Sequence, residues 1–209
     1  MPNVLKRTGG LQNATSKLNS LGLAFAAKDK TWFGVLVDDQ DYLVASAFSD
    51  KRRVIKNHLV RYSLKVAHIS PKEVKHSFAE DMAKLHNGEA PKRPVKLGSI
   101  GISEFQEKVY EVLKKIPRGR VTNYGLIAKA IKSGPRAVGN AVGSNPWPLF
   151  VPCHRVVPSD MTVGNYSMIN SPGHENSPVK KTLLYREGVR FQGEKIPPSA
   201  LWSPARFSR

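Results

Sequence analysis

The feature that most constrains this chain is the segment Asn145–Val157, which holds the only cysteine of the sequence, Cys153, between prolines and apolar residues. Pro148 and Pro152 remove backbone donors and fix φ, so the approach to the thiol is an extended or turn path. Asn145-Pro146 initiates a turn and ends whatever helix precedes it. The thiol therefore has to be presented from a rigid, irregular segment between regular elements.

A lone cysteine is more often a small buried hydrophobe than a nucleophile. The residues that follow it favour chemistry, because His154 and Arg155 belong to the types that lower the pKa of a nearby thiol. Adjacent residues point apart on a helix or a strand, so His154 needs a water or a turn to take the Cys153 proton. A cysteine peptidase is disfavoured, because its base comes from a distant part of the sequence.

Charge predicts the kind of partner. The chain has 33 Lys and Arg against 16 Asp and Glu, a net charge of +17, which points to a polyanion, nucleic acid before an anionic membrane. The steepest imbalance runs from Lys108 to Arg136, where eight basic residues face the single acid Glu111. A generally basic, solvated surface is the plain alternative.

Composition excludes several classes of protein. A single cysteine rules out an internal disulfide and a multi-cysteine zinc site, and it fits a reducing intracellular compartment. We expect no metal and no cofactor. No apolar run approaches the ~20 residues of a membrane span, and 40% hydrophobic with 23% charged residues is typical of a globular protein.

The N-terminal half predicts a small α/β lobe over residues 21–89, after an extension over residues 1–20 that we expect to be disordered. Three apolar stretches separated by polar turns predict antiparallel strands at Leu23–Ala26, Trp32–Val37 and Tyr42–Phe48. Helical spacing follows in residues 54–62, and again in residues 74–85 after Ser70-Pro71. Two prolines and a glycine make residues 90–98 a linker.

The second domain, residues 99–191, is predicted to be mainly helical. Ser103–Gln106 is a capping box that opens a helix, Thr122 is expected to cap a second, and a third starts at Pro135. This spacing indicates a helix-turn-helix. A last helix starts at Ser177-Pro178, and residues 192–209 are expected to be a loosely docked basic tail. The fold class is therefore α/β (α+β).

The third helix of this domain, residues 135–143, is rich in alanine and glycine. Gly139 inside a helix costs about 1 kcal/mol relative to alanine, so something must offset that loss. Close approach to a DNA groove is one explanation. Close packing against another helix explains Gly139 and Gly143 nearly as well, but it does not explain Arg136.

These motifs closely resemble the O6-alkylguanine-DNA alkyltransferases, also called methylated-DNA–protein-cysteine methyltransferases. The resemblance covers roughly residues 105–189, and the N-terminal lobe agrees only in its ribonuclease H-like layout. The segments that carry it are Arg136–Gly139, Asn145-Pro146, Pro152–Val156, Gly164–Ser167 and Leu183–Gly188. The segment around Cys153, with Arg136–Gly139 before it and Asn165–Ser167 after it, is far more specific for this family than a helix-turn-helix alone.

The resemblance implies repair of DNA by direct reversal of damage. The helix-turn-helix would dock in the minor groove of double-stranded DNA that carries O6-alkylguanine, or less readily O4-alkylthymine. The damaged base would be flipped out of the duplex into an active-site loop. Cys153 would take the alkyl group irreversibly, in a single turnover. The resemblance also implies a monomer that works inside the cell, with the DNA.

The resemblance further assigns roles to individual residues. It implies Cys153 as nucleophile and His154, linked through a water and held by Glu187, as proton acceptor. Tyr124 would donate toward the guanine ring and Arg136 would fill the place of the extruded base. The remaining implied residues are Asn145 as a hinge, Ala137, Gly139, Gly143, Val156, Tyr166 and Ser167 as DNA or substrate contacts, and Pro148, Pro152, Arg155 and Asn165 as structural neighbours.

The chain departs from the family pattern after Ser167, where a Gly-Gly pair is usual but Met168 and Ile169 stand here. A bulkier residue at position 168 and an apparently longer loop predict a narrower pocket. The cysteines with which some relatives hold zinc in the N-terminal lobe are missing. Two alternatives remain open: a non-enzymatic lesion-binding alkyltransferase-like protein, although such proteins replace the nucleophile, and a helix-turn-helix transcription factor with a redox cysteine.

Overall fold

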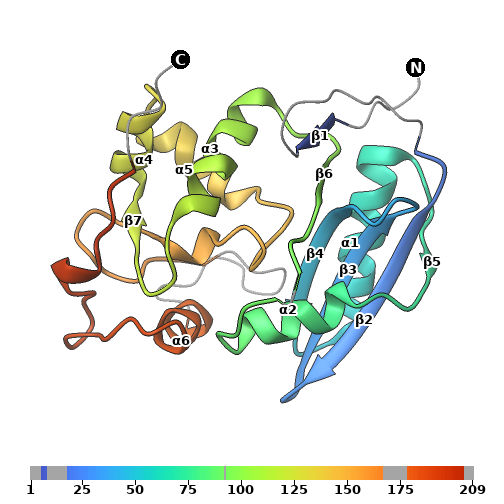
Figure 1. Ribbon diagram of the computed structural model, residues 1–209, viewed down its shortest axis with the longest axis horizontal. Helices are drawn as coiled ribbons and strands as arrows, with labels where there is room; N and C mark the ends of the chain where they lie inside the picture. Colours follow the sequence, from blue (N-terminus) through green and yellow to red (C-terminus); the bar gives the residue numbers. More distant parts are fainter. Residues whose placement is uncertain (1–5, 9–17, 92, 167–177, 205–209) are drawn as a thin grey trace. The chain divides into compact units, whose positions relative to one another are not determined.

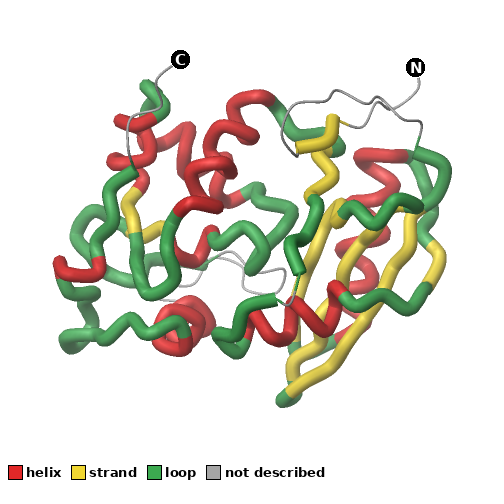
Figure 2. Tube along the Cα trace, in the orientation of Figure 1, coloured by secondary structure: helices red, strands yellow, loops and turns green. Residues whose placement is uncertain are grey.

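The computed structural model describes residues 6–8, 18–91, 93–166 and 178–204 (Figure 1). The chain divides into two compact units, one that runs to Ile102 and one that starts at Ser103. The first is built on a sheet with two helices, and the second consists mainly of helices and long loops (Figure 2). The mixed α/β class predicted from the sequence is confirmed.

The centre of the first unit is an antiparallel sheet of three strands, β2 (Leu21–Lys28), β3 (Thr31–Asp38) and β4 (Leu43–Ser49). These are the three strands that the apolar stretches predicted. Three short strands extend the sheet in the order β1-β6-β4-β3-β2-β5: β1 (Lys6–Thr8), β5 (Lys72–Glu73) and β6 (Leu97–Ser99). The sheet is mixed, because β5 and β6 pair in parallel with β2 and β4.

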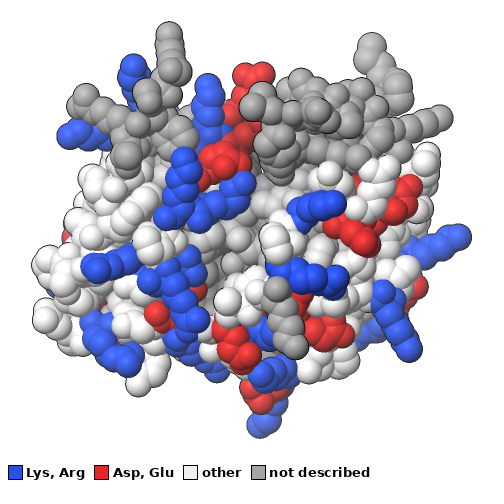
Figure 3. Space-filling view, in the orientation of Figure 1, with Lys and Arg blue, Asp and Glu red and all other residues white. Residues whose placement is uncertain are grey.

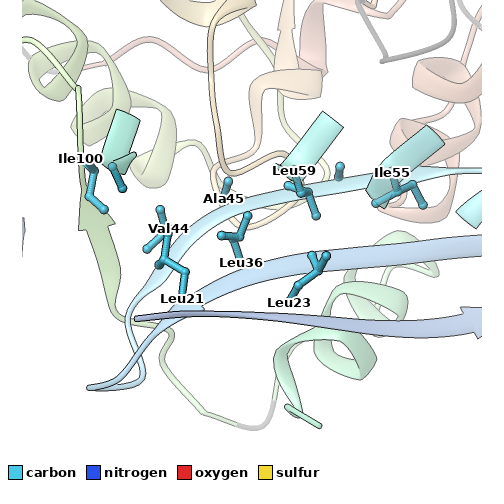
Figure 4. Close-up of a cluster of buried hydrophobic side chains, with 10 residues drawn as sticks. Leu21, Leu23, Leu36, Val44, Ala45, Ile55, Leu59 and Ile100 are labelled. Atoms are coloured by element: carbon cyan, nitrogen blue, oxygen red, sulfur yellow. The ribbon is translucent and has the colours of Figure 1, made fainter. Parts of the chain in front are cut away.

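Helices α1 (Arg52–Ala67) and α2 (Phe78–His86) cover opposite faces of the sheet. Side chains alternate between the faces of a strand. A Cβ at Gly34 would lie 2.4 Å from Ile55 of α1, so only glycine lets this helix sit so close, and Ile55 and Leu59 pack there in the core shown in Figure 4. On the other face, the adjacent ring of Phe33 contacts His86 of α2 with centroids 5.2 Å apart.

Some of the boundaries predicted for helices, strands and the linker in the N-terminal half were wrong. Helix α2 begins at Phe78, because residues 72–73 pair with β2 and the Val74 amide donates to the Leu23 carbonyl at 3.0 Å. The expected linker overlaps β6, and the second unit begins at Ser103 and not near Ser99. The expected extension contains strand β1, which pairs with β6. Sequence periodicity cannot reveal strands of two or three residues, since their pairing comes from the sheet edge.

The second unit contains the predicted helix-turn-helix. Helix α3 (Glu104–Lys115) starts at the capping box, in which the Gln106 amide donates to Ser103 Oγ and the Ser103 amide to Gln106 Oε1. Helices α4 (Tyr124–Ala130) and α5 (Pro135–Gly143) follow. The cap of α4 is Asn123, whose Oδ1 accepts from the Leu126 amide at 2.8 Å. The predicted cap Thr122 lies one residue too early, in the two-residue strand β7 (Thr122–Asn123).

The C-terminal segment is not loosely docked as predicted. After helix α6 (Pro178–Arg186), the chain returns to the core of the second unit, where Ile196 and Ala200 are buried beside Val121. The Val121 amide donates to the Ala200 carbonyl, and the Trp202 amide donates to the Val121 carbonyl. The segment has no periodicity because prolines and the short 3₁₀ turn η2 (Pro198–Ala200) direct it. No helix in the described part of the chain has the length and apolar character needed to cross a bilayer.

Candidate active site

Cys153 begins a short 3₁₀ turn, η1 (Cys153–Arg155), directly after Pro152. The Cys153 amide donates to the Val151 carbonyl at 2.8 Å, and the Arg155 amide donates to the Pro152 carbonyl at 3.0 Å. Strand β8 (Val156–Val157) then pairs in parallel with β7. The turn that holds the thiol is thereby fixed to the residues that open α4, the first helix of the helix-turn-helix.

Asn145 connects the end of α5 to the same turn. Its Nδ2 donates to the Val151 carbonyl at 2.9 Å, and its Oδ1 accepts from the Trp147 amide at 3.0 Å. Trp147 is buried and packs edge-on against Tyr110 of α3, whose hydroxyl donates to the Ala141 carbonyl of α5. A single amide side chain thus fixes the bend predicted at Asn145-Pro146.

A buried network of His154, Glu187 and Arg155 lies beside the thiol turn. His154 Nε2 is 2.9 Å from Glu187 Oε1. Arg155 donates to both carboxylate oxygens of Glu187, from Nε at 2.8 Å and from Nη2 at 2.7 Å. Its third contact runs from Nη1 to the Ile116 carbonyl at the end of α3, at 2.7 Å. Arg155 therefore holds the Glu187 carboxylate in place.

The network sets the protonation state of His154. Burial lowers the pKa of His154, and this outweighs the opposing effect of Glu187, whose charge is already balanced by Arg155. An ionised carboxylate only accepts hydrogen bonds, so neutral His154 donates from Nε2. Its Nδ1 is buried and has no hydrogen-bond partner among the residues that the structure describes. The imidazole therefore offers an unused lone pair.

Cys153 is a protonated thiol at rest. Burial raises the pKa of Cys153, and hydrogen bonds from Asn145 and Tyr166 together with the charge of Lys180 offset only part of this effect. The sequence argument that neighbouring cations lower this pKa is therefore wrong in its net direction. A base is needed to produce the thiolate.

Two tyrosines lie near the sulfur. The Tyr166 hydroxyl is 3.8 Å from Cys153 Sγ, and burial, followed by the charge of Cys153, raises the pKa of Tyr166 well above its usual value. The same two causes raise the pKa of Tyr124, the first residue of α4. Both phenols are neutral donors at physiological pH.

Helix α5 presents small and basic residues outward. Arg136 and Ala137 are exposed in its first turn, and Gly143 is exposed at its end. A Cβ at Gly139 would meet only the Tyr124 ring, at 3.9 Å, and a Cβ at Gly143 would meet nothing within 4 Å. Close packing against another described helix therefore does not explain these glycines. Lysines and arginines lie among carboxylates over the face in Figure 3.

The remaining predicted residues lie around the turn, with one exception. Pro152 is buried and Pro148 half-buried before the thiol, Val156 is buried after it, and Asn165 is exposed beside Tyr166. Gly164 has φ +66°, and a Cβ there would lie 2.6 Å from the Pro158 ring, so glycine is required. Ser167, Met168 and the loop 170–177 lie outside the described residues. No group of three or more metal-ligating side chains gathers in the described part of the chain.

Comparison with known proteins decides the family. Residues 104–189 match the model of the 6-O-methylguanine DNA methyltransferase DNA-binding domain. The methylated-DNA–protein-cysteine methyltransferase of Thermococcus kodakarensis is 36% identical over 169 residues, which cover 76% of this chain and 90% of that protein. The chain belongs to the methylated-DNA–protein-cysteine methyltransferase family.

Solved structures agree with this family. The O6-methylguanine-DNA methyltransferase of Pyrococcus kodakaraensis superimposes with a TM-score of 0.65 at 33% identity, covering 81% of this chain and 99% of that one. The Mycobacterium tuberculosis protein, solved in complex with DNA, gives 0.59 at 26% identity and covers 79% of this chain and 92% of that one. Three further archaeal methyltransferases match over 91 residues, so this chain spans 47–48% of their length.

Sequence reasoning missed one residue of this methyltransferase site, Lys180. It is buried on α6, and its Nζ donates to the Val156 carbonyl at 2.7 Å. The signal was present in the spacing, since Lys180, Leu183, Leu184 and Glu187 fall on one helical face. A lysine within an otherwise buried stripe is a candidate for a specific interaction.

Glu187 makes a testable contribution to stability against acid. Burial alone raises the pKa of Glu187, but hydrogen bonds from His154 and Arg155 outweigh it and lower the value to about 2. A depressed carboxyl pKa stabilises the fold above the unfolded value of 4.5 and loses that contribution as pH falls toward 2. Over this pH range, we expect the free energy of unfolding of Glu187→Gln to fall by on the order of 2 kcal/mol less than that of the parent.

Urea unfolding at several pH values between 5 and 2.5 measures this difference. Glu194→Gln is the matched control, because Glu194 is exposed and pairs only with Lys181 in the described structure. Its pH dependence should follow the parent. Equal pH dependence in all three proteins would contradict the buried network as the source of the effect.

Proposed function

We propose that the protein repairs duplex DNA by moving the alkyl group of O6-alkylguanine, and less readily that of O4-alkylthymine, to Cys153 in a single turnover. The observation that carries the proposal is the buried thiol next to a neutral imidazole whose Nε2 is held by Glu187 and whose Nδ1 is unused. The chain acts as a monomer on the minor groove, inside the cell where the DNA is.

The thiolate forms by proton transfer from Cys153 to His154. Adjacent residues do not face each other in regular structure, so a bridging water carries the proton to Nδ1. Glu187 fixes the imidazole tautomer and stabilises the imidazolium. Arg155 holds the carboxylate in place with two hydrogen bonds. Cys153 therefore becomes a strong nucleophile only when His154 has accepted its proton.

The transfer itself is a substitution at the alkyl carbon. A bond from sulfur to carbon forms, the bond from carbon to O6 breaks, and its electron pair returns to the guanine, which takes up the proton that the thiol gave up. Tyr124 donates toward the ring, while Tyr166 lines the pocket and the Val156 carbonyl accepts from the exocyclic amine. The thioether has no low-barrier route back, so the protein is consumed.

The DNA has to be deformed for this reaction. A base inside a duplex does not offer its alkyl carbon to the sulfur, and extrusion costs a few kcal/mol. Arg136 fills the space that the base leaves, and the exposed small residues of α5 let the helix lie deep in the groove. Asn145 couples the end of that helix to the thiol turn. Basic side chains offset part of the cost through phosphate contacts.

A duplex oligonucleotide with one O6-methylguanine tests the proposal. We expect the peptide that contains Cys153 to gain the mass of one methyl substituent, in a stoichiometric reaction that the unmethylated duplex does not support. A mass change elsewhere, or none, would contradict alkyl transfer. Tight binding to the lesion without transfer would instead indicate a lesion-binding protein, and a sequence-specific footprint on undamaged DNA would indicate a transcription factor.

A further inference from the structure

Helix α1 of the first unit carries a strong positive charge that the proposed mechanism does not use. Residues 51–75 contain eight basic residues and one acid, Glu73, which is the same imbalance as in residues 108–136 around the helix-turn-helix. Arg52 and Lys56 both pair with Glu73, each at 2.7 Å. The single carboxylate of this stretch is therefore already engaged, and the other cations of the helix need a separate explanation.

The other cations of α1 form a row along its solvent side. Ile55 and Leu59 lie between the helix and the sheet (Figure 4). Residues four apart share one side of a helix, so Arg53, Arg61 and Lys65 line up on the side away from that core. All three are exposed, and none forms an ion pair with a carboxylate in the part of the chain that the structure describes. At 1.5 Å per residue the row is about 18 Å long.

This distribution of charge is unfavourable for the helix itself. Like charges four residues apart on a helix repel each other, as Arg61 and Lys65 do. The first turn of α1 has no acidic residue, and its cap Lys51 makes no side-chain hydrogen bond, although cations at this end oppose the helix dipole. A bound anion would remove both costs. The row is therefore better explained by an anionic partner than by the stability of the helix.

The chemistry of the row favours a nucleic acid over a membrane. A helix that lies on a membrane inserts apolar side chains, but the apolar side of α1 packs on the sheet, and Leu64 is its exposed large hydrophobic residue. Double-stranded DNA carries one negative charge per about 1.7 Å of its axis, so a row of this length faces on the order of ten phosphates. DNA is also the polymer on which the proposed reaction takes place.

We propose that the solvent side of α1 is a second DNA-binding surface, on which Arg53, Arg61 and Lys65 bind the phosphate backbone without reading its sequence. The inference rests on the proposed function for the identity of the polyanion, but it concerns binding and not alkyl transfer. These contacts extend the interaction with DNA beyond the helix-turn-helix. They add affinity that falls as the salt concentration rises, because each phosphate contact releases counterions.

A triple variant of the full chain, Arg53→Gln with Arg61→Gln and Lys65→Gln, tests the proposal. Glutamine has nearly the helix propensity of arginine and lysine, and the variant loses the repulsion within the row, so its transition temperature should not fall. Each lost phosphate contact lowers the slope of log K against log salt by about 0.9. We therefore expect the slope for an undamaged duplex to fall by about two to three, and the affinity at low salt to fall by more than about tenfold.

The matched control replaces Lys28, Lys30 and Lys75 by glutamine, which removes the same charge from exposed positions outside α1. Its salt slope should stay close to that of the parent. Equal slopes for the parent and the α1 variant would overturn the proposal. An equal decrease in both triple variants would also overturn it, because the effect would then come from net charge and not from the row.

A second measurement uses the parent protein and needs no substitution. Bound duplex should protect Lys65 from acetylation, followed by mass spectrometry, while the exposed Lys30 stays reactive. Protection of Lys65 by polyglutamate or by phosphatidylserine vesicles, but not by DNA, would overturn the proposal and indicate an acidic protein or a membrane as the partner. Absence of methyl transfer in a parent whose Lys65 is protected by DNA would refute the proposed function and leave this inference standing.

Discussion

Cys153→Ser is expected to abolish alkyl transfer while leaving binding to lesion-bearing duplex intact. A serine keeps the size of the side chain and its contact with Tyr166, but its hydroxyl has a far higher pKa than a thiol, so the neutral His154 does not produce an alkoxide. The loss reaches the background level of the assay, because no second thiol exists in the chain. The measurement is transfer of a labelled methyl group from duplex DNA to protein.

The binding measurement separates catalysis from folding. The serine variant should bind a duplex with O6-methylguanine at the same protein concentration as the parent, because the substitution leaves helices α4 and α5 of the helix-turn-helix unchanged. Residual transfer to the serine variant, or transfer to another residue, would place the nucleophile elsewhere. Loss of both transfer and binding would show that the substitution disturbs the turn between Pro152 and Val156.

Arg136→Ala is expected to slow repair of duplex DNA by about tenfold to a hundredfold, because nothing then fills the stack behind the extruded base. Arg136 is exposed in the first turn of α5 and lies outside the His154 network. Reaction with free O6-benzylguanine, which needs no extrusion, should keep its rate. The ratio of the two rate constants measures the contribution to flipping.

Lys129→Ala supplies a charge-matched control, since Lys129 is an exposed cation in the last turn of α4. It should reduce duplex affinity modestly, in a salt-dependent way, and leave the ratio of duplex to free-base rates unchanged. If both variants lower the ratio equally, Arg136 acts only as a phosphate contact. If Arg136→Ala slows both substrates alike, the residue supports the site and not the flipped base.

The sequence predicted correctly those elements that depend on local residue patterns. The capping box at Ser103 gave the start of α3, and alternation gave the three long strands. Thr122 was predicted as the cap because threonine is a common capping residue, but the pairing of β7 with β8 places Thr122 in a strand, and Asn123 is the cap. The course of residues 192–204 depends on burial against Val121, and sequence periodicity does not predict this packing.

The residues of the site also divide into those that the local sequence predicted and those that only the folded structure brings together. Prolines and the adjacent histidine marked Cys153 from the residues alone, whereas Glu187 emerged only through resemblance, since it looks like an ordinary carboxylate at a helix end. Lys180 was missed because its partners are backbone carbonyls of Val156 and Asn165, far away in sequence. The net pKa of the thiol was misjudged because burial is a property of the folded chain.

The return of the C-terminal segment makes the thiol turn depend on residues that lie far from it in the sequence. Val121 bonds to Ala200 and Trp202 on one side, and the residue after it, Thr122, pairs with Val156 on the other. Displacement of residues 196–202 would therefore remove the backbone bonds that support the strand pair behind the reactive turn. A disturbance of the C-terminal segment is thus transmitted to the nucleophile through the backbone pairing of residues 121 and 122.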